Sequence, residues 1–116
     1  MELPAEYLRG IEFFNQGQYF ECHEAFESLW LKSEGIEREF LHAMIQIAAS
    51  LHHFNRGNPK GAMSIYQRAR QRLETVPEIV MRLDTKVFLR EIETFLFWGS
   101  TSRTLQPSLP QIRLTD

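Results

Sequence analysis

The sequence predicts an all-α protein, a single-domain antiparallel bundle of about five helices with an extended C-terminal tail. Apolar residues recur at helical spacing along almost all of the 116 residues, and the breaks in this pattern fall at glycine, proline and asparagine. The connections between the predicted helices are short, which is typical of antiparallel neighbours in a bundle. No strand is needed to explain the pattern, and a chain of this length can fold as one domain without a disulfide or a structural metal.

The first three helices are predicted over about residues 4–17, 19–32 and 36–56. Pro4 suits the first turn of a helix, because its missing N–H would have no partner there in any case. Gly17 ends the first helix, since glycine is common just past a helix C-terminus. The third helix is apolar around most of its circumference, so we expect it to be buried in the centre of the bundle.

The junction Gly57-Asn58-Pro59 is the clearest boundary in the chain. Glycine closes the third helix, asparagine caps the fourth, and proline occupies the first turn of the fourth. The inward positions of this fourth helix follow at helical spacing: Ala62, Ile65, Ala69 and Leu73.

Val76-Pro77 interrupts the helical pattern, and a short turn or helix is expected to follow. Asp84 can cap a fifth helix that ends before Gly99. We expect a helical bundle domain over residues 1–100 and a tail over residues 101–116 that packs along the bundle, although docking of the tail on a partner is an alternative. The tail is too apolar for simple disorder, as it contains Leu105, Leu109, Ile112 and Leu114.

Composition and charge narrow the function classes. The formal net charge of −2 gives no electrostatic reason to bind nucleic acid or an anionic membrane, which argues against both. No apolar run approaches the ~20 residues of a membrane span, and the N-terminus lacks the features of a secretory signal. Cys22 is the only cysteine, so no internal disulfide can form and we expect a small buried hydrophobe at this position. A cytoplasmic protein is the expectation that follows.

The most informative stretch runs over residues 19–30, because His23, Glu27 and Trp30 stand four and three residues apart. On an α-helix such residues are neighbours on one face. Tyr19 lies on the same broad apolar face, and His23 and Glu27 are expected at its edge, turned toward the core. The string His-Glu-Ala-Phe-Glu is not a zincin motif, which requires a second histidine where Glu27 stands.

A polar stripe runs through the otherwise apolar third helix at helical spacing, formed by His42, Gln46, Ala49 and His53. If this stripe faces the second helix, the bundle contains an internal polar cluster or pocket. Its predicted members are Tyr19, His23, Glu27, Trp30, Gln46 and His53. Unpaired burial of such groups costs on the order of 1–3 kcal/mol each, so they must satisfy one another, water, a metal or a ligand.

Three interpretations of this cluster stay open. In the first, Glu27 accepts a hydrogen bond from an imidazole or from Gln46 and the cluster fixes the register of the helices. In the second, His23, Glu27 and His53 bind zinc or non-haem iron, although no cofactor is required and Glu27 is the only strong inward acid. In the third, Tyr19, Trp30 and the polar groups line a pocket for a small molecule or a peptide.

These residues resemble a known family, the domain-of-unknown-function family 309, which comprises small helical proteins of bacteria and archaea. The resemblance rests on a His-x-x-x-Glu-x-x-Trp motif at His23, Glu27 and Trp30 and covers roughly residues 11–75. It extends to three further segments, which are Phe14-Asn15-x-Gly17-x-Tyr19-x-Glu21, Leu41-x-x-x-Ile45-Gln46-x-Ala48 with His53, and Gly57-Asn58-x-x-Gly61-Ala62. The resemblance implies an all-α bundle and supplies no established activity.

Two functional hypotheses follow. The favoured one is an interaction or ligand-binding module with a buried His/Glu/Gln cluster, and the alternative is a metal-dependent or proton-transfer enzyme that uses His23, Glu27 and His53. Whether the protein is an enzyme is left open, because the sequence contains no motif that names a reaction. His52 is expected to be a packed core or interface residue. At least one of Phe95, Phe97 and Trp98 should be exposed and could mark a homodimer or a contact with another protein.

Overall fold

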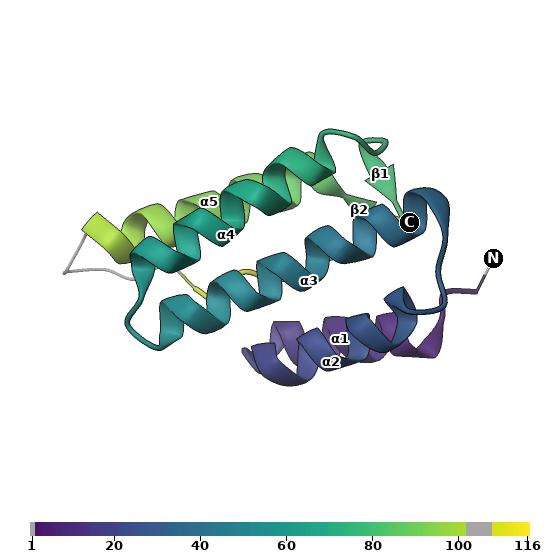
Figure 1. Cartoon of the computed structure of the whole chain (residues 1–116), viewed down its shortest axis with the longest axis horizontal. Coiled ribbons are helices and arrows are strands. Elements are labelled where there is room, and N and C mark those ends of the chain that lie inside the picture. The colour runs from purple at the N-terminus through teal and green to yellow at the C-terminus, as the bar shows by residue number, and fades with distance from the viewer. Residues whose placement is uncertain (1, 102–107) are drawn as a thin grey trace.

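The computed structural model describes residues 2–101 and 108–116, which form an all-α bundle with one very short β-hairpin (Figure 1). The predicted fold class is therefore confirmed. In chain order the elements are α1 (Ala5–Asn15), α2 (Tyr19–Trp30), α3 (Gly35–Asn55), α4 (Pro59–Leu73), β1 (Ile79–Val80), β2 (Leu83–Asp84) and α5 (Thr85–Thr101).

The long helix α3 lies at the centre, between the pair α1 and α2 on one side and the pair α4 and α5 on the other (Figure 1). Helix α2 packs on α3, and α4 packs on the opposite side of α3. The largest side chains that α3 contributes to the interior are fully buried: Phe40, Leu41, Met44, Ile47 and Leu51. This burial confirms the expectation from the apolar circumference of α3.

The helix ends follow the signals in the sequence. Gly17 and Gly57 adopt positive φ values of 76° and 81°, a conformation that is easy only for glycine, and each follows a helix. The side-chain oxygen of Asn58 accepts a hydrogen bond from the N–H of Gly61 (3.0 Å) at the start of α4. Asp84 caps α5 in the same manner, since its Oδ1 accepts from the N–H groups two and three residues further on (3.1 Å each).

A short antiparallel hairpin stands where the sequence predicted a turn or helix and no strand. Strands β1 and β2 pair through Ile79 with Asp84 and Val80 with Leu83. Between them, Met81 and Arg82 have φ values of 49° and 65°. This backbone is typical of a two-residue hairpin turn, which usually carries Asn-Gly. The sequence pattern predicted a turn or helix here and did not require these strands, because Met-Arg is not a typical hairpin-turn sequence.

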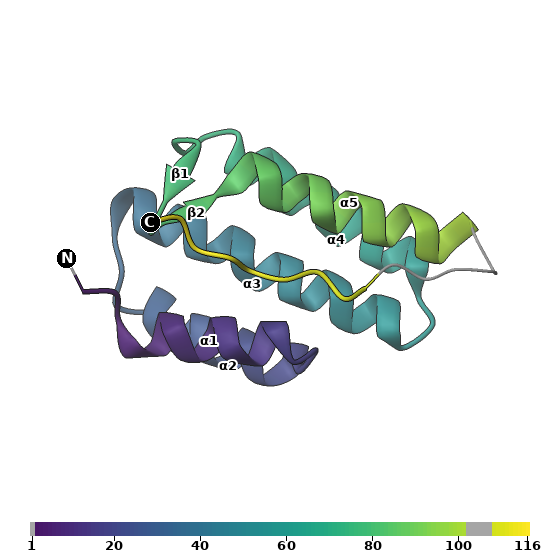
Figure 2. The ribbon, with the colours of Figure 1, turned by 180° about the vertical axis from the view of Figure 1, so that it is seen from behind.

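Residues 108–116 run in an extended conformation along α3, between α1 and α5 (Figure 2). Pro110 is fully buried and Ile112 is 3% exposed, so this part of the chain packs on the bundle. Residues 102–107, including Leu105 of the predicted tail, lie outside the described residues. Helix α5 continues to Thr101, two residues beyond the Gly99 at which the sequence predicts its end.

Two large aromatic residues near the end of α5 face solvent. Phe97 is 58% exposed and Trp98 is 45% exposed, whereas Phe95 is buried against Phe54. Among residues 2–101 and 108–116, no helix has both the length and the apolar character that crossing a membrane requires.

Candidate functional site

The first part of α2 and the C-terminal part of α3 enclose a pocket of about 280 Å³. Its lining residues come from these two helices alone: Tyr19, Phe20 and His23 from α2, and Ala49, His52 and His53 from α3. We call this the histidine pocket. It brings together three of the six residues that the sequence predicted as a cluster, namely Tyr19, His23 and His53.

Tyr19 supplies the most unusual polar group of the histidine pocket. The residue is only 3% exposed, and its hydroxyl is buried without a hydrogen-bond partner in the described part of the chain. Burial, with a smaller contribution from Cys22, raises the pKa of this hydroxyl to about 12. The group therefore stays protonated at neutral pH and keeps an O–H that donates to none of the described residues.

The three histidines give the pocket a further set of donors and acceptors. His23, His52 and His53 are each partly buried, and the ring centroids of His52 and His53 lie 6.3 Å apart. Each neutral imidazole offers one donor and one acceptor nitrogen. His52 was predicted to be a packed or interface residue, but it lines the pocket because helix α3 presents positions 49, 52 and 53 on adjoining faces at its end.

Glu27 does not line the histidine pocket. It is exposed on α2, whereas the sequence pattern predicted it at the inner edge of that helix. The buried residues Cys22, Phe26 and Leu29 define the inward face of α2, and at roughly 100° per residue Glu27 falls on its solvent side. Its carboxylate is therefore not part of a buried cluster with His23.

Trp30 lies at the other end of α2, in a separate patch. The Arg38 guanidinium stands over its ring at 4.1 Å from the centroid and donates to its carbonyl oxygen (3.0 Å). His42 meets the same ring edge-on, with centroids 5.5 Å apart. The indole Nε1 of Trp30 is buried and has no hydrogen-bond partner within residues 2–101 and 108–116.

The side chain of Gln46 forms a hydrogen bond with a residue of α4 and not with one of α2. Its Oε1 accepts from Nε of Arg72 (3.4 Å), and Arg72 also forms an ion pair with Glu39 (2.5 Å). Burial lowers the pKa of His42, and the nearby positive charges of Arg72 and Arg38 lower it further, while Glu39 opposes them. The lowered pKa of His42 favours its neutral imidazole form in this second patch.

Five of the six predicted residues therefore divide between two places, and Glu27 lies in neither. Across the described ranges, no three His, Cys, Asp or Glu side chains are grouped so that they could hold a metal ion. The contacts of Arg38 with Trp30 and of Arg72 with Gln46 could not be predicted from the sequence. An aromatic residue near an arginine, or a glutamine on a mostly apolar helix, gives no hint of which distant side chain will reach it.

By its fold and its pocket, the protein is a small all-α protein with a pocket between two neighbouring helices. A family model described as "Domain of unknown function (DUF309)" matches residues 7–65, and the chain belongs to this family. The resemblance noted in the sequence is therefore confirmed at the level of the family.

Relatives of known sequence or structure agree with this membership. The structure of a conserved hypothetical protein from Thermus thermophilus superposes with a TM-score of 0.72 and 33% sequence identity, over 83% of this chain and 99% of that one. An uncharacterised protein of Aquifex aeolicus (strain VF5) is 29% identical over 77 residues, which cover 64% of this chain. The match spans only 23% of the Aquifex protein.

Proposed function

We propose that this protein is a ligand-binding module whose site is the histidine pocket between α2 and α3. The observation that carries the proposal is the hydroxyl of Tyr19, a residue of the pocket wall. This hydroxyl is buried and has no hydrogen-bond partner among the described residues. An unsatisfied buried hydroxyl costs on the order of 1–3 kcal/mol, and phenylalanine would fill the same volume without this cost. A ligand that accepts a hydrogen bond from Tyr19 would explain why a tyrosine stands there.

The lining indicates the kind of molecule that would fit. The volume of about 280 Å³ lies just below the range of about 300–1,000 Å³ that is usual for ligand pockets, so the expected ligand is a very small organic molecule. Phe20, which is 57% exposed, offers an apolar edge at the rim, while His23, His52 and His53 offer several hydrogen-bonding nitrogens. The expected ligand therefore combines a hydrogen-bond acceptor with a small apolar part.

The comparisons support the idea of a module. The Thermus protein is matched over 99% of its length, so a similar bundle makes up almost all of that chain. In the Aquifex protein the matching segment is 23% of the whole. A unit that occurs alone in one protein and within a longer chain in another is compatible with a binding function that several partners can use.

A fragment screen by saturation-transfer NMR tests the proposal. Polar fragments of fewer than about 15 non-hydrogen atoms would be screened against the wild type, Tyr19→Phe, His23→Ala and, as a control, Trp30→Phe. We expect fragments that bind the wild type and Trp30→Phe equally and bind Tyr19→Phe and His23→Ala at least tenfold more weakly. Equal binding to all four proteins, or no binding to a folded wild type, would contradict the proposal.

A metal site at His23 and His53, without the Glu27 that the sequence predicted as a third ligand, is the second candidate, and the observation that favours it is that both histidines line the same pocket. With Glu27 exposed, a zinc or iron ion there would have two imidazoles from this chain and would take its other ligands from water or substrate. Elemental analysis of protein purified without chelator, beside His23→Ala and His53→Ala, distinguishes the two. Near-stoichiometric metal that both variants lose would favour the metal site over the module.

A further inference from the structure

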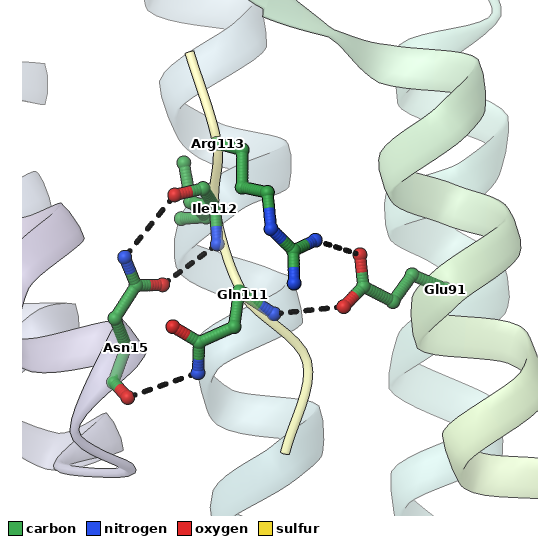
Figure 3. Close-up of polar contacts among 5 residues, drawn as sticks. All are labelled: Asn15, Glu91, Gln111, Ile112 and Arg113. Carbon is green, nitrogen blue, oxygen red and sulfur yellow. Dashed lines mark hydrogen bonds and ion pairs between the residues drawn. The ribbon is translucent and has the colours of Figure 1, made fainter. Parts of the chain in front are cut away.

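The last nine residues of the chain are bound to the bundle as a separate peptide would be. Residues 108–116 lie extended between α1 and α5, and most of the hydrogen bonds from the folded body described below reach their main-chain atoms (Figures 2 and 3). We call the body residues that make these contacts the tail-binding surface: Asn15, Gly17, Arg82 and Glu91.

Asn15, the last residue of α1, holds the tail from one side. Its Nδ2 donates to the carbonyl oxygen of Ile112 (3.1 Å), and its Oδ1 accepts from the N–H of the same residue (2.7 Å) (Figure 3). One side-chain amide thus pairs with both polar main-chain groups of Ile112, as a neighbouring strand would. In addition, the side chain of Gln111 donates to the main-chain oxygen of Asn15 (3.1 Å).

Two further residues hold the tail from the other side and at its end. Glu91 of α5 accepts from the N–H of Gln111 (3.0 Å) and pairs with the guanidinium of Arg113 (3.2 Å) (Figure 3). Near the C-terminus, the N–H of Thr115 donates to the main-chain oxygen of Arg82 (2.7 Å), and Nε of Arg82 donates to the oxygen of Thr115 (2.7 Å). Five main-chain atoms of the tail are therefore bonded to the body.

Apolar side chains complete the fit. Pro110 and Ile112 stand two residues apart and are buried, which matches the alternation of an extended chain, while Arg113 is exposed. Leu109 lies against Gly17, where a Cβ atom would stand 3.0 Å from its methyl group. The absence of a side chain at Gly17 therefore makes room for the tail.

From these contacts we propose that the tail-binding surface also accepts residues 108–116 of a second copy of this chain. Every hydrogen bond and ion pair described above is non-covalent and joins the body to atoms within residues 111–115. A second copy presents the same sequence and can make the same bonds, including the ion pair with Glu91. Exchange of the tails would thus form a dimer without new contacts, and protein concentration would set the balance between monomer and dimer.

Two full-length variants that complement one another test this proposal. The first carries Asn15→Ala and Glu91→Ala, which damage the tail-binding surface and keep an intact tail. The second carries Ile112→Asp, which damages the tail and keeps an intact surface. We expect each variant alone to be a monomer by native mass spectrometry, and the equimolar mixture to contain a one-to-one heterodimer.

The heterodimer should fall at least tenfold in abundance when Ile112→Asp is added to the first variant, because no intact tail then remains. As a control, Ile79→Asp replaces Ile112→Asp and changes an isoleucine that is 54% exposed on β1. This control variant should show the same proportions of monomer and dimer as the wild type. A mixture that stays monomeric while circular dichroism shows both variants to be folded would overturn the proposal.

Ile112→Asp could instead prevent folding. In that case a synthetic peptide of residues 108–116 is added in trans at millimolar concentration. Recovery of the helical circular dichroism signal would show that the surface accepts a tail from outside its own chain and would support the proposal. Failure of the peptide to restore the signal would overturn it, because the tail would then be an inseparable part of the fold.

Discussion

Tyr19 and Trp30 lie on the same helix and share an unusual property, since each buries a polar atom that finds no partner in the described residues. Tyr7 and Tyr66 provide the contrast. The hydroxyl of Tyr7 donates to the main-chain oxygen of Met81 (3.1 Å), and that of Tyr66 donates to Glu93 (2.7 Å). Burial alone therefore does not explain the unpaired hydroxyl of Tyr19, because the same side chain is paired at other buried positions of this protein.

Tyr19→Phe is expected to raise the free energy of unfolding by about 1 kcal/mol, because it removes an unsatisfied buried hydroxyl and keeps the ring. Tyr7→Phe is the matched control, and it should lower the same quantity by about 1 kcal/mol because it breaks a hydrogen bond. Urea unfolding of the two variants and the wild type measures both effects. A loss of stability in Tyr19→Phe as large as that in Tyr7→Phe would show that the Tyr19 hydroxyl is satisfied in solution.

His42 should make the stability of the protein depend on pH. Its pKa in the folded state is lowered below the usual 6.5, so as the pH falls below this value the unfolded chain takes up the proton first. The free energy of unfolding should therefore decrease on acidification through this range. Between pH 7.5 and pH 5 the decrease should be smaller in His42→Gln, as measured by urea unfolding at each pH.

Arg72→Gln tests in a second way whether the lowered pKa of His42 causes this pH dependence of stability. Removing this cation should let His42 take up a proton more readily in the folded state, which would also reduce the loss of stability on acidification. An unchanged pH dependence in both variants would mean that other groups account for it.

The candidate site shows where inference from single residues stops. Tyr19, His23 and His53 line one pocket, and helical spacing indicates only which face each residue occupies on its own helix. It does not determine which distant side chain will bind a polar group on that face. Gln46 is bound by Arg72, a residue 26 positions away on α4, and no local pattern predicts this partner.

At the scale of the elements, α1 and α2 approach each other closely at Gly10. A Cβ atom added there would overlap the ring of Phe26, which is fully buried and has no room to move. Helix propensity alone would favour alanine over glycine by about 1 kcal/mol in the interior of α1. The contact with Phe26 therefore explains why a glycine is found in the middle of this helix.

Gly10→Ala is expected to destabilise the protein by about 1–3 kcal/mol, because overpacking outweighs the gain in helix propensity. Combining it with Phe26→Leu should relieve the overlap, so the double variant should lose less stability than the sum of the two single variants. Thermal or urea unfolding of the wild type, the two single variants and the double variant measures this double-mutant cycle. Additive losses would mean that the two residues do not meet in solution.

Most of the element boundaries could be predicted, and the exception is informative. Gly17, Asn58 and Asp84 stop or cap helices through local geometry, which the sequence reveals directly. The hairpin depends instead on contacts from elsewhere. The main-chain oxygen of Met81 accepts from Tyr7, and that of Arg82 accepts from Thr115, so distant residues support a turn that its own sequence does not favour.

At the scale of the whole molecule, residues far apart in the sequence join the two halves of the bundle. Asn15 and Ile112 are 97 positions apart, and Tyr7 and Met81 are 74 positions apart. Figures 1 and 2 show that α1 belongs to the pair on one side of α3, whereas the hairpin and α5 belong to the other side. The tail thus connects both sides across the face of α3.

This position of the tail has a consequence for the rates of folding and unfolding. A contact across 97 residues closes a long loop, so it is expected to form after the rate-limiting step, once the helices have assembled. Asn15→Ala should then leave the folding rate almost unchanged and increase the unfolding rate by about fivefold, which corresponds to a loss of about 1 kcal/mol.

Stopped-flow measurements of both rates against urea concentration would test this expectation, and a slower folding rate in Asn15→Ala would contradict it. If it holds, the last residues of the chain act chiefly on the lifetime of the native state. The helices would determine how fast the protein reaches its structure, and nine residues at the end would determine how long each molecule keeps it.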